Sequence, residues 1–411
     1  MQALMPRTDI QPVILGGDWS SYAIAREFFE AFAVSTYCVA PGAVAVIAKS
    51  RFMDVYPVSH LDQSCTLDAL RDIARRHASQ TVVLMANTDD RVEIVESIAD
   101  DLPDNVIFQF PPHELASMVS DKVRFQELCR KYGLDTPRTE VVSLAGEEPI
   151  APTLVPFPLV AKPAVSSQYA PLFARGFQKV YFVQAQEELD RLWADLRAAG
   201  FSGDFLVQEL IGGDDTYMDS ISMYVNSAGK VAVRAGAHVL LEDHVPALFG
   251  NPVAMITKPM DELWDKLGKM LTDIGWRGFA NIDLKRDPRD GRKVFMDFNP
   301  RIGANSYYVC AGGANPMYVL VRDIVDGVTD DDFVVRKNVL YKRIPVSLLR
   351  DYVLDPDLRD KLDEVVALGK VVNPTRCRQD TFLSQANGAL MEMNYIRKFR
   401  TYYPKPTQTS F

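Results

Sequence analysis

Asp297, Asn299 and Arg301 could together bind a metal ion and stabilise charge on a reacting group. They lie in a segment that reads Val294-Phe295-Met296-Asp297-Phe298-Asn299-Pro300-Arg301. Residues i and i+2 of a β-strand share a face, so Asp297 and Asn299 point the same way. A carboxylate and an amide oxygen are hard ligands that suit Mg2+. Arg301 would place a guanidinium beside that metal, where it would stabilise a transferring phosphoryl group or a tetrahedral oxyanion.

A second carboxylate, Asp283, stands in the apolar segment 279–284, which the loop 285–293 joins to the strand bearing Asp297. If the two strands pair as a hairpin, Asp283 sits across from Asp297. Two carboxylates could then hold one or two Mg2+ ions that bridge ATP phosphates. A buried pair of carboxylates without a cation would be costly. The alternative is that Asp283 is a solvent-exposed residue at a strand end, and the two interpretations are equally open.

Two lysines could bind phosphate. Lys162 ends the apolar strand Phe157-Pro158-Leu159-Val160-Ala161-Lys162-Pro163, and Lys122 stands at the start of an expected helix. A lysine at the end of an apolar strand must reach a charged partner or extend to solvent, and a phosphate fits the first case. Either lysine taken alone is more often a solvated surface residue.

The segment 205–215 could bind a nucleoside. An apolar strand runs into a short linker and then a Gly-Gly turn, so backbone groups around Glu209 to Ile211 could contact an adenine edge. Asp215, just beyond the turn, could hold ribose hydroxyls. The alternative is an ordinary acidic turn, and for this segment in isolation the alternative is favoured.

The composition is typical of an ordinary folded protein. The chain has 411 residues, of which 47% are hydrophobic and 24% charged, and its formal net charge is −9. A negative surface disfavours nucleic acid as a partner, and we interpret the basic stretch 285–293 as a solvated hairpin loop. The five cysteines are scattered, the N-terminus does not resemble a signal peptide, and no apolar run is long enough to span a membrane. These features favour a cytoplasmic enzyme.

Residues 1–115 are expected to form a small open α/β domain of Rossmann-like type. Apolar strands without polar alternation are interleaved with helices, which is typical of a parallel sheet covered on both faces. Ser20 or Ser21 is expected to cap the first helix. The turn Gly16-Gly17-Asp18 is not a dinucleotide fingerprint, although a substrate contact through its amides is open. The expected strands span 12–15, 34–39, 81–85 and 106–110, and a later helix spans 91–99.

Residues 116–325 are expected to be α+β with antiparallel strand pairs, and residues 326–411 form a mixed segment without a motif. A helix over 121–132 has Ser120 as its expected N-cap and ends at Gly133. The other expected helices span 185–199 and 260–274, and the strands span 159–162, 205–208, 220–225, 231–235, 279–284 and 294–298.

Together and in this order, these motifs resemble the ATP-grasp superfamily, in which two α+β lobes clamp ATP between them. The resemblance covers residues from about 115 to 320, with a matching α/β domain ahead of it. It implies ATP and Mg2+ (or Mn2+) as cofactors, Lys162 and Arg301 as catalytic residues, and an N-terminal pre-ATP-grasp domain. The usual residue at Asp297 is Glu. The implied phosphate, nucleoside and metal contacts are Lys122, Lys162, Gln208, Glu209, Leu210, Ile211, Asp215, Asp283, Asp297 and Asn299.

The loop after Lys162 departs from the superfamily pattern, because it is not glycine-rich. Ser166 and Ser167 are expected to supply hydroxyls and amides to the phosphates instead. This loop, the turn at 208–215 and the segment 236–244 resemble the D-aspartate ligase branch. Such enzymes activate the β-carboxylate of D-aspartate as an acyl-phosphate and attach it to a lysine of a peptidoglycan precursor.

Two histidines near these motifs have open roles. His238 and His244 could contact substrate or deprotonate the amine, and a structural role for each is at least equally favoured. The resemblance thus implies small-molecule acid and amine substrates, with no prediction of oligomeric state.

Three other functions compete with this one. They are an ATP-grasp ligase for another amino acid or a dipeptide, a non-catalytic nucleotide-binding module, and an NAD-dependent oxidoreductase. The intact set of Asp283, Asp297, Asn299 and Arg301 disfavours a decayed site. The oxidoreductase depends on Gly16-Gly17 alone and is the least favoured.

Overall fold

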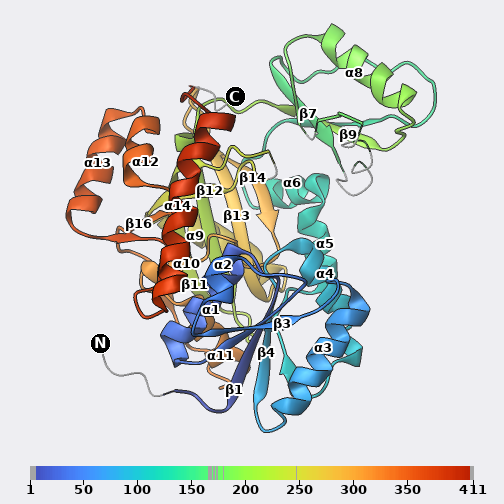
Figure 1. Cartoon of the computed structure of the whole chain (residues 1–411). Coiled ribbons are helices and arrows are strands. Elements are labelled where there is room, and N and C mark those ends of the chain that lie inside the picture. The colour runs from blue at the N-terminus through green and yellow to red at the C-terminus, as the bar shows by residue number, and fades with distance from the viewer. Residues whose placement is uncertain are drawn as a thin grey trace. The chain divides into compact units, whose positions relative to one another are not determined.

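The computed structural model describes residues 6–407 except 165–168, 170–171, 173–174, 179 and 247. The chain divides into two units, each with its own contacts (Figure 1). Unit 1 contains Met1–Ser120, Asp214–Asp283 and Phe298–Phe411, and unit 2 contains Asp121–Gly213 and Leu284–Asp297. The functional boundaries expected after residues 115 and 325 remain predictions.

The N-terminal part of unit 1 is a five-stranded parallel sheet, in the order β3-β2-β1-β4-β5. Alternate residues of β1 enter different cores: Ile14 packs on the face covered by α1, and Val13 packs on the face covered by α3. This confirms the expected open α/β arrangement. The strands are β1 Ile10–Leu15, β2 Thr36–Ala40, β3 Met53–Pro57, β4 Thr81–Met85 and β5 Val106–Ile107; the helices are α1 Trp19–Phe32, α2 Ala45–Ala48, α3 Gln63–Arg76, α4 Asp89–Ser97, η1 Ala99–Asp101 and α5 His113–Ser120.

Two helix caps differ from the sequence prediction. Asp18, not Ser20 or Ser21, caps α1, and its carboxylate accepts hydrogen bonds from the backbone N–H groups of both serines at 2.9 and 3.1 Å. Asp121, not Ser120, caps the helix α6, Lys122–Lys131. Ser120 cannot take that position because it is still the last residue of α5. In both places the residue in extended conformation has the side chain that reaches two free amides.

The rest of unit 1 is built on a larger, mostly antiparallel sheet, in the order β14-β13-β10-β11-β12-β16-β17, with β15 beside β11. Residues 284–297 of the β13–β14 hairpin belong to unit 2. Its strands are β10 Met218–Val225, β11 Val231–Glu242, β12 Pro252–Thr257, β13 Gly278–Arg286, β14 Lys293–Asn299, β15 Phe333–Val334, β16 Leu340–Lys342 and β17 Val371–Val372; the accompanying helices are η2 Asp215–Tyr217, α9 Asp261–Asp273, α10 Tyr307–Ala311 and α11 Pro316–Ile324.

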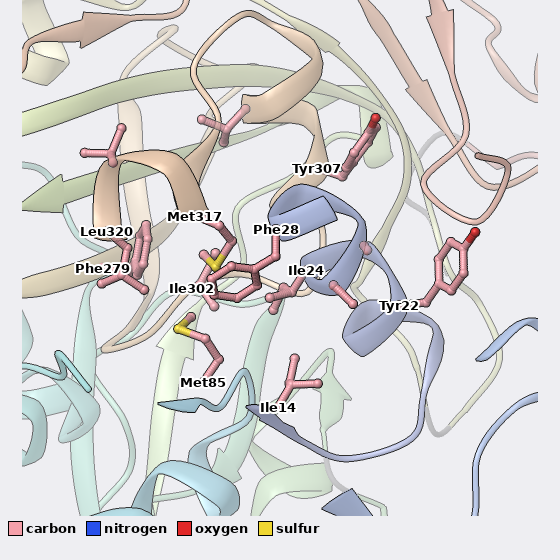
Figure 2. Close-up of a cluster of buried hydrophobic side chains, with 14 of the residues drawn as sticks. Ile14, Tyr22, Ile24, Phe28, Met85, Phe279, Ile302, Tyr307, Met317 and Leu320 are labelled. Atoms are coloured by element: carbon pink, nitrogen blue, oxygen red, sulfur yellow. The ribbon is translucent and has the colours of Figure 1, made fainter. Parts of the chain in front are cut away.

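One apolar core joins the N-terminal sheet to the larger sheet within unit 1. Figure 2 shows Phe28 and Ile24 of α1 gathered with Met317 of α11, while Ile14 and Met85 approach from the parallel sheet. Phe279 of β13 and Ile302, just after β14, belong to the same cluster. The ends of β1 and β4 and Ile302, which follows β14, therefore share one core.

The C-terminal segment, for which the sequence shows no motif, packs against β11, β12 and β16. Leu240 and Ile256 share a core with Leu349 and Phe399. Helix α14 also contacts α2, where Ser384 Oγ donates a hydrogen bond to the Val46 carbonyl at 2.9 Å (Figure 1). The C-terminal segment therefore completes unit 1. Its helices are α12 Val346–Tyr352, α13 Pro356–Ala367 and α14 Phe382–Tyr402.

Unit 2 is built on a four-stranded antiparallel sheet, in the order β6-β9-β7-β8. Its core lies between this sheet and α8, where Trp193 and Leu196 meet Phe205. The strands are β6 Thr139–Ser143, β7 Leu159–Pro163, β8 Tyr181–Val183 and β9 Asp204–Glu209, and α8 spans Gln186–Ala198. No helix in the described part of the chain combines the length and apolar character that a membrane crossing requires.

Candidate active site

The structure brings Asp283 and Asn299 together in unit 1. Asp283 lies inside β13, half-buried, rather than at a strand end. Its Oδ2 is 3.4 Å from Asn299 Nδ2, and its Oδ1 accepts a hydrogen bond from Ser220 Oγ at 2.9 Å. Both residues were expected at the site, each as a partner of Asp297 rather than of the other. Their role as metal ligands remains a prediction.

Arg301 lies beside Asn299 and is oriented by a residue that the sequence interpretation missed. Arg301 Nη2 donates to Asn299 Oδ1 at 3.3 Å. Its Nε donates to Asp89 Oδ1 at 2.7 Å, and Asp89 begins α4. The Arg301 side chain is 15% exposed and that of Asp89 is 60% exposed. Asp89 thus fixes the direction of a largely buried guanidinium from the solvent side.

Asp297, in unit 2, makes an ion pair with Lys122. Asp297 and Asn299 are separated in β14 by the buried Phe298, as the alternation of a strand requires. The carboxylate expected to bind metal and the lysine expected to bind phosphate are therefore partners of each other in this structure. Asp283 belongs to unit 1, so a metal shared by Asp283 and Asp297 remains a prediction.

Lys162 lies in β7, in register with Leu206 of β9, and is half-buried. Its strand was expected, and so was its position near the end of that strand. Ser166 and Ser167 lie outside the described residues. The phosphate contacts expected from these three residues remain predictions.

The segment expected to contact adenine begins at the end of β9 in unit 2. Gln208 and Glu209 are buried, and Ile211 beyond Leu210 is buried as well. Gln208 Nε2 donates to Thr139 Oγ1 at 3.0 Å, and the Glu209 N–H donates to the Arg138 carbonyl at 2.8 Å. The strand end is thus held firmly on one side by β6.

The basic loop 285–293 is not simply solvated, which corrects the sequence interpretation. Arg289 and Arg292 both donate to Glu209 Oε1, at 2.5 and 2.8 Å, and both also contact Asp287. Asp287 is fully buried, and the hydrogen bond from Arg289 lowers its pKa to about 2. Burial is the largest influence on the pKa of Glu209 and would raise it, but the hydrogen bonds from Arg289 and the Arg138 N–H, together with the charges of Arg289 and Arg292, lower it overall. Acidic partners within unit 2 therefore take up much of the positive charge.

Asp215, expected to hold ribose, is 4% exposed. Its Oδ2 accepts hydrogen bonds from the Glu242 N–H at 2.9 Å and from His244 Nε2 at 3.0 Å. The His244 ring in turn stacks on Tyr403, with centroids 3.6 Å apart and planes 3° from parallel. This arrangement ties the η2 turn to the C-terminal residues and favours the structural interpretation of His244. The ribose contact of Asp215 remains a prediction.

His238 lies on the opposite face of the sheet from Asp283. Its Nδ1 is 2.8 Å from Asp219 Oδ1, the residue in register with it on β10. Ser220, the next residue of β10, contacts Asp283, and successive strand residues point to opposite faces. The geometry therefore favours a structural role for His238 over a contact with a substrate at Asp283.

The turn after β1 is shaped by a close approach of Arg91. Gly16 has φ +104°, a backbone conformation that residues with a Cβ rarely adopt, and an added Cβ would lie 2.1 Å from Arg91 Nη1, so Arg91 would have to move. Arg91 Nη2 is 2.9 Å from Asp18 Oδ2. Burial would raise the pKa of Asp18, but the hydrogen bond from Ser20 and the charge of Arg91 lower it overall. The role of Arg91 in this turn was not predicted from the sequence, because the turn residues that it contacts are distant from it along the chain.

The sequence is similar to that of known ligases. It is 26% identical over 416 residues to a D-aspartate ligase from Enterococcus faecium (strain Aus0004), which covers 95% of this chain and 96% of that protein. A carbamoyl phosphate synthase large chain from Clavibacter michiganensis subsp. michiganensis (strain NCPPB 382) is 23% identical over 57% of this chain and 21% of its own length. No family model matches the chain.

Solved structures share the fold. An N5-carboxyaminoimidazole ribonucleotide synthetase in complex with ADP aligns with a TM-score of 0.56 at 13% identity, over 83% of this chain and 82% of that one. A phosphoribosylamine–glycine ligase from Thermotoga maritima aligns with a TM-score of 0.52 at 18% identity, over 80% and 78%. The biotin carboxylase domain of a Hydrogenobacter thermophilus 2-oxoglutarate carboxylase, solved with MgADP and bicarbonate, aligns with a TM-score of 0.56 at 14% identity, over 80% and 73%.

Proposed function

We propose that this chain, an ATP-dependent carboxylate–amine ligase with the ATP-grasp fold, activates the β-carboxylate of D-aspartate and joins it to an amine. The observation that carries the proposal is the side-by-side placement of Asp283, Asn299 and Arg301 in unit 1. The similarity to a D-aspartate ligase along nearly the whole chain supports the choice of acid. The amine that we propose is a lysine side chain of a peptidoglycan precursor.

Asp283 and Asn299 fit a magnesium ion. A carboxylate oxygen and an amide oxygen suit hard divalent cations, and the two side chains lie side by side, with Asn299 Nδ2 3.4 Å from Asp283 Oδ2. Among the described residues, no three His, Cys, Asp or Glu side chains gather closely enough to hold a metal alone. The remaining ligands would then be phosphate oxygens, water and Asp297. When bound, Mg2+ would neutralise charge on the ATP phosphates, and Mn2+ accepts the same ligands.

Arg301 is the residue to which we assign charge stabilisation. Its side chain is 15% exposed and its guanidinium is held by Asp89, so little reorganisation is needed when negative charge develops beside it. In the proposed reaction the γ-phosphoryl of ATP is transferred to the acid, which gives an acyl-phosphate and ADP. The amine then attacks the acyl carbon and phosphate leaves. Positioning and neutralisation of charge carry such a transfer, so no protein nucleophile is required.

We assign the nucleotide contacts to unit 2 and to the η2 turn. Lys122 and Lys162 would contact phosphates, and the backbone from Gln208 to Ile211 would contact adenine. Asp215 would hold the ribose, although its carboxylate already accepts hydrogen bonds from His244 and the Glu242 N–H. A cytoplasmic location is part of the proposal, supported by the use of ATP and by five free cysteines.

The proposal is tested by measuring ADP release with Mg2+ while acids and amines are varied. ADP should form only when both an acid and an amine are present, and D-aspartate should be the preferred acid. A product whose mass equals the two substrates less one water should appear with ADP. Turnover supported only by other acids would overturn D-aspartate, and nucleotide binding without ADP formation for any pair would overturn the ligase reaction.

A further inference from the structure

Two consecutive cationic residues at the end of β16 are both buried, but their charged groups have different kinds of partner. Lys342 is 8% exposed and pairs with Glu392, which also accepts a hydrogen bond from Asn373 Nδ2 at 3.0 Å. Arg343 is 6% exposed, yet no hydrogen bond or ion pair joins its guanidinium to any residue in the described part of the chain. Burying a charge without a partner is costly. Arg343 therefore has donor groups available for an anion from outside.

Aromatic rings hold the Arg343 guanidinium in place. The guanidinium carbon lies 3.4 Å from the ring centroid of Trp19 and 5.3 Å from that of Tyr395. Lys398 Nζ approaches the same Tyr395 ring at 4.6 Å. Contacts with ring faces stabilise a cation but do not use the N–H donors along the guanidinium edge. That edge is suited to two parallel hydrogen bonds with a carboxylate.

The position of Trp19 places this arginine at a ligand-binding edge of the fold. Trp19 begins α1, directly after the turn at the carboxyl end of β1. The strand order reverses direction between β1 and β4, and open α/β sheets bind ligands beyond the carboxyl ends of strands at such a point. Asp89, which orients Arg301, follows β4. Asn87, in the loop after β4, donates a 2.7 Å hydrogen bond to Ser20 Oγ in the first turn of α1.

We infer that Arg343 binds the second carboxylate of the acid substrate, the one that is not activated. The inference rests on the proposed ligase function and extends it to specificity. Aspartate keeps its α-carboxylate when its β-carboxylate accepts phosphoryl, and a planar guanidinium pairs with a free carboxylate in a bidentate manner. Arg343 then makes the enzyme selective for dicarboxylic amino acids. β-Alanine has the same carboxylate and amine as aspartate but lacks the second carboxylate.

The experiment compares D-aspartate with β-alanine in the wild type and in Arg343→Gln. Loss of one partner of a buried ion pair weakens binding by at least about 30-fold. We therefore expect the KM for D-aspartate to rise by about that factor or more in the variant. The KM for ATP and the kinetics with β-alanine should stay within about twofold of the wild type. Arg343→Lys keeps the charge but not the planar edge, so its KM for D-aspartate should lie between those of the wild type and Arg343→Gln.

Arg350→Gln is the matched control, because Arg350 pairs with Asp363 on the surface of the same C-terminal segment at 2.7 Å. Arg350→Gln should change neither the KM for D-aspartate nor the KM for ATP. Thermal stabilisation by D-aspartate, measured without ATP, should be present in the wild type and lost in Arg343→Gln. The melting temperature of Arg343→Gln without ligand, measured in parallel, shows whether the variant is folded as the wild type is.

The outcomes separate this inference from the ligase assignment. An unchanged KM for D-aspartate in Arg343→Gln, with an active wild type, would overturn the role of Arg343 and leave the ligase intact. If the wild type forms no ADP with any acid, the ligase assignment fails. The stabilisation by D-aspartate but not β-alanine then still decides whether Arg343 binds a second carboxylate.

Discussion

The contact between Arg301 and Asp89 allows two losses of catalytic rate to be measured separately. One is the loss when Arg301 is no longer oriented by Asp89, and the other is the loss when Arg301 itself is removed. The pair is 2.7 Å long, but the Asp89 side chain is 60% exposed. Ion pairs with one exposed partner contribute about 0.2–1 kcal/mol. Asp89→Asn should therefore lower kcat/KM by no more than about fivefold and leave thermal stability nearly unchanged.

Arg301→Met removes the guanidinium itself. Loss of one donor that stabilises a developing oxyanion costs about 100- to 1,000-fold in rate. Because Asp89 is proposed to act only through Arg301, the double variant Asp89→Asn/Arg301→Met should be no slower than Arg301→Met alone. The assay is ADP release with D-aspartate and amine at saturating MgATP, with thermal melting measured in parallel on all four proteins.

Two results would refute this reasoning. If Asp89→Asn is as slow as Arg301→Met while it melts at the wild-type temperature, Asp89 has a role of its own in the reaction. If the two losses multiply in the double variant, the residues act independently. Near-normal turnover of Arg301→Met would remove Arg301 from the mechanism altogether.

Further predictions concern the metal, the nucleotide and acid stability. Asp297→Asn should abolish ADP release with little loss of folded protein by circular dichroism, because it removes charge from the proposed metal site; normal turnover would contradict that role. Lys162→Met should raise the KM for ATP more than that for the acid, and an unchanged nucleotide affinity would count against the phosphate contact. The pKa of Asp287 is lowered from 3.8 to about 2, chiefly by the hydrogen bond from Arg289. Its stabilising contribution is thus complete above pH 4 and lost as pH falls toward 2, so Asp287→Asn should flatten the fall in melting temperature over that range; an unchanged slope would contradict it.

The motifs whose partners are near in sequence could be predicted well. The strands β4 and β14 follow from apolar runs, and the common face of Asp297 and Asn299 follows from the two-residue period of a strand. The expected hairpin makes β13 and β14 neighbours, which the sheet order confirms. Periodicity also located α8 and α9 to within one residue at each end.

The contacts that orient the site could not be predicted, because they join residues far apart along the chain. Asp89 and Arg301 are separated by 212 positions. Strand β3 and helix α3 were not predicted from the sequence either. Three of the five residues of β3 are exposed, so this strand lacks a continuous apolar run. The buried Asp215 contacts His244, whose ring stacks on Tyr403, and these three residues belong to separate segments. In each case tertiary packing, not local pattern, decides the environment.

The shared core of α1 and α11 has a consequence for biosynthesis. Unit 1 consists of three separate stretches of chain, and its last stretch begins only at Phe298. Until residues near Met317 have left the ribosome, Phe28 and Ile24 of α1 lack part of the apolar surface that covers them (Figure 2). An N-terminal fragment that ends after α5 would keep that surface exposed to water. The nascent protein therefore gains the full cover for this apolar surface only when its last stretch, from Phe298 onward, has been synthesised.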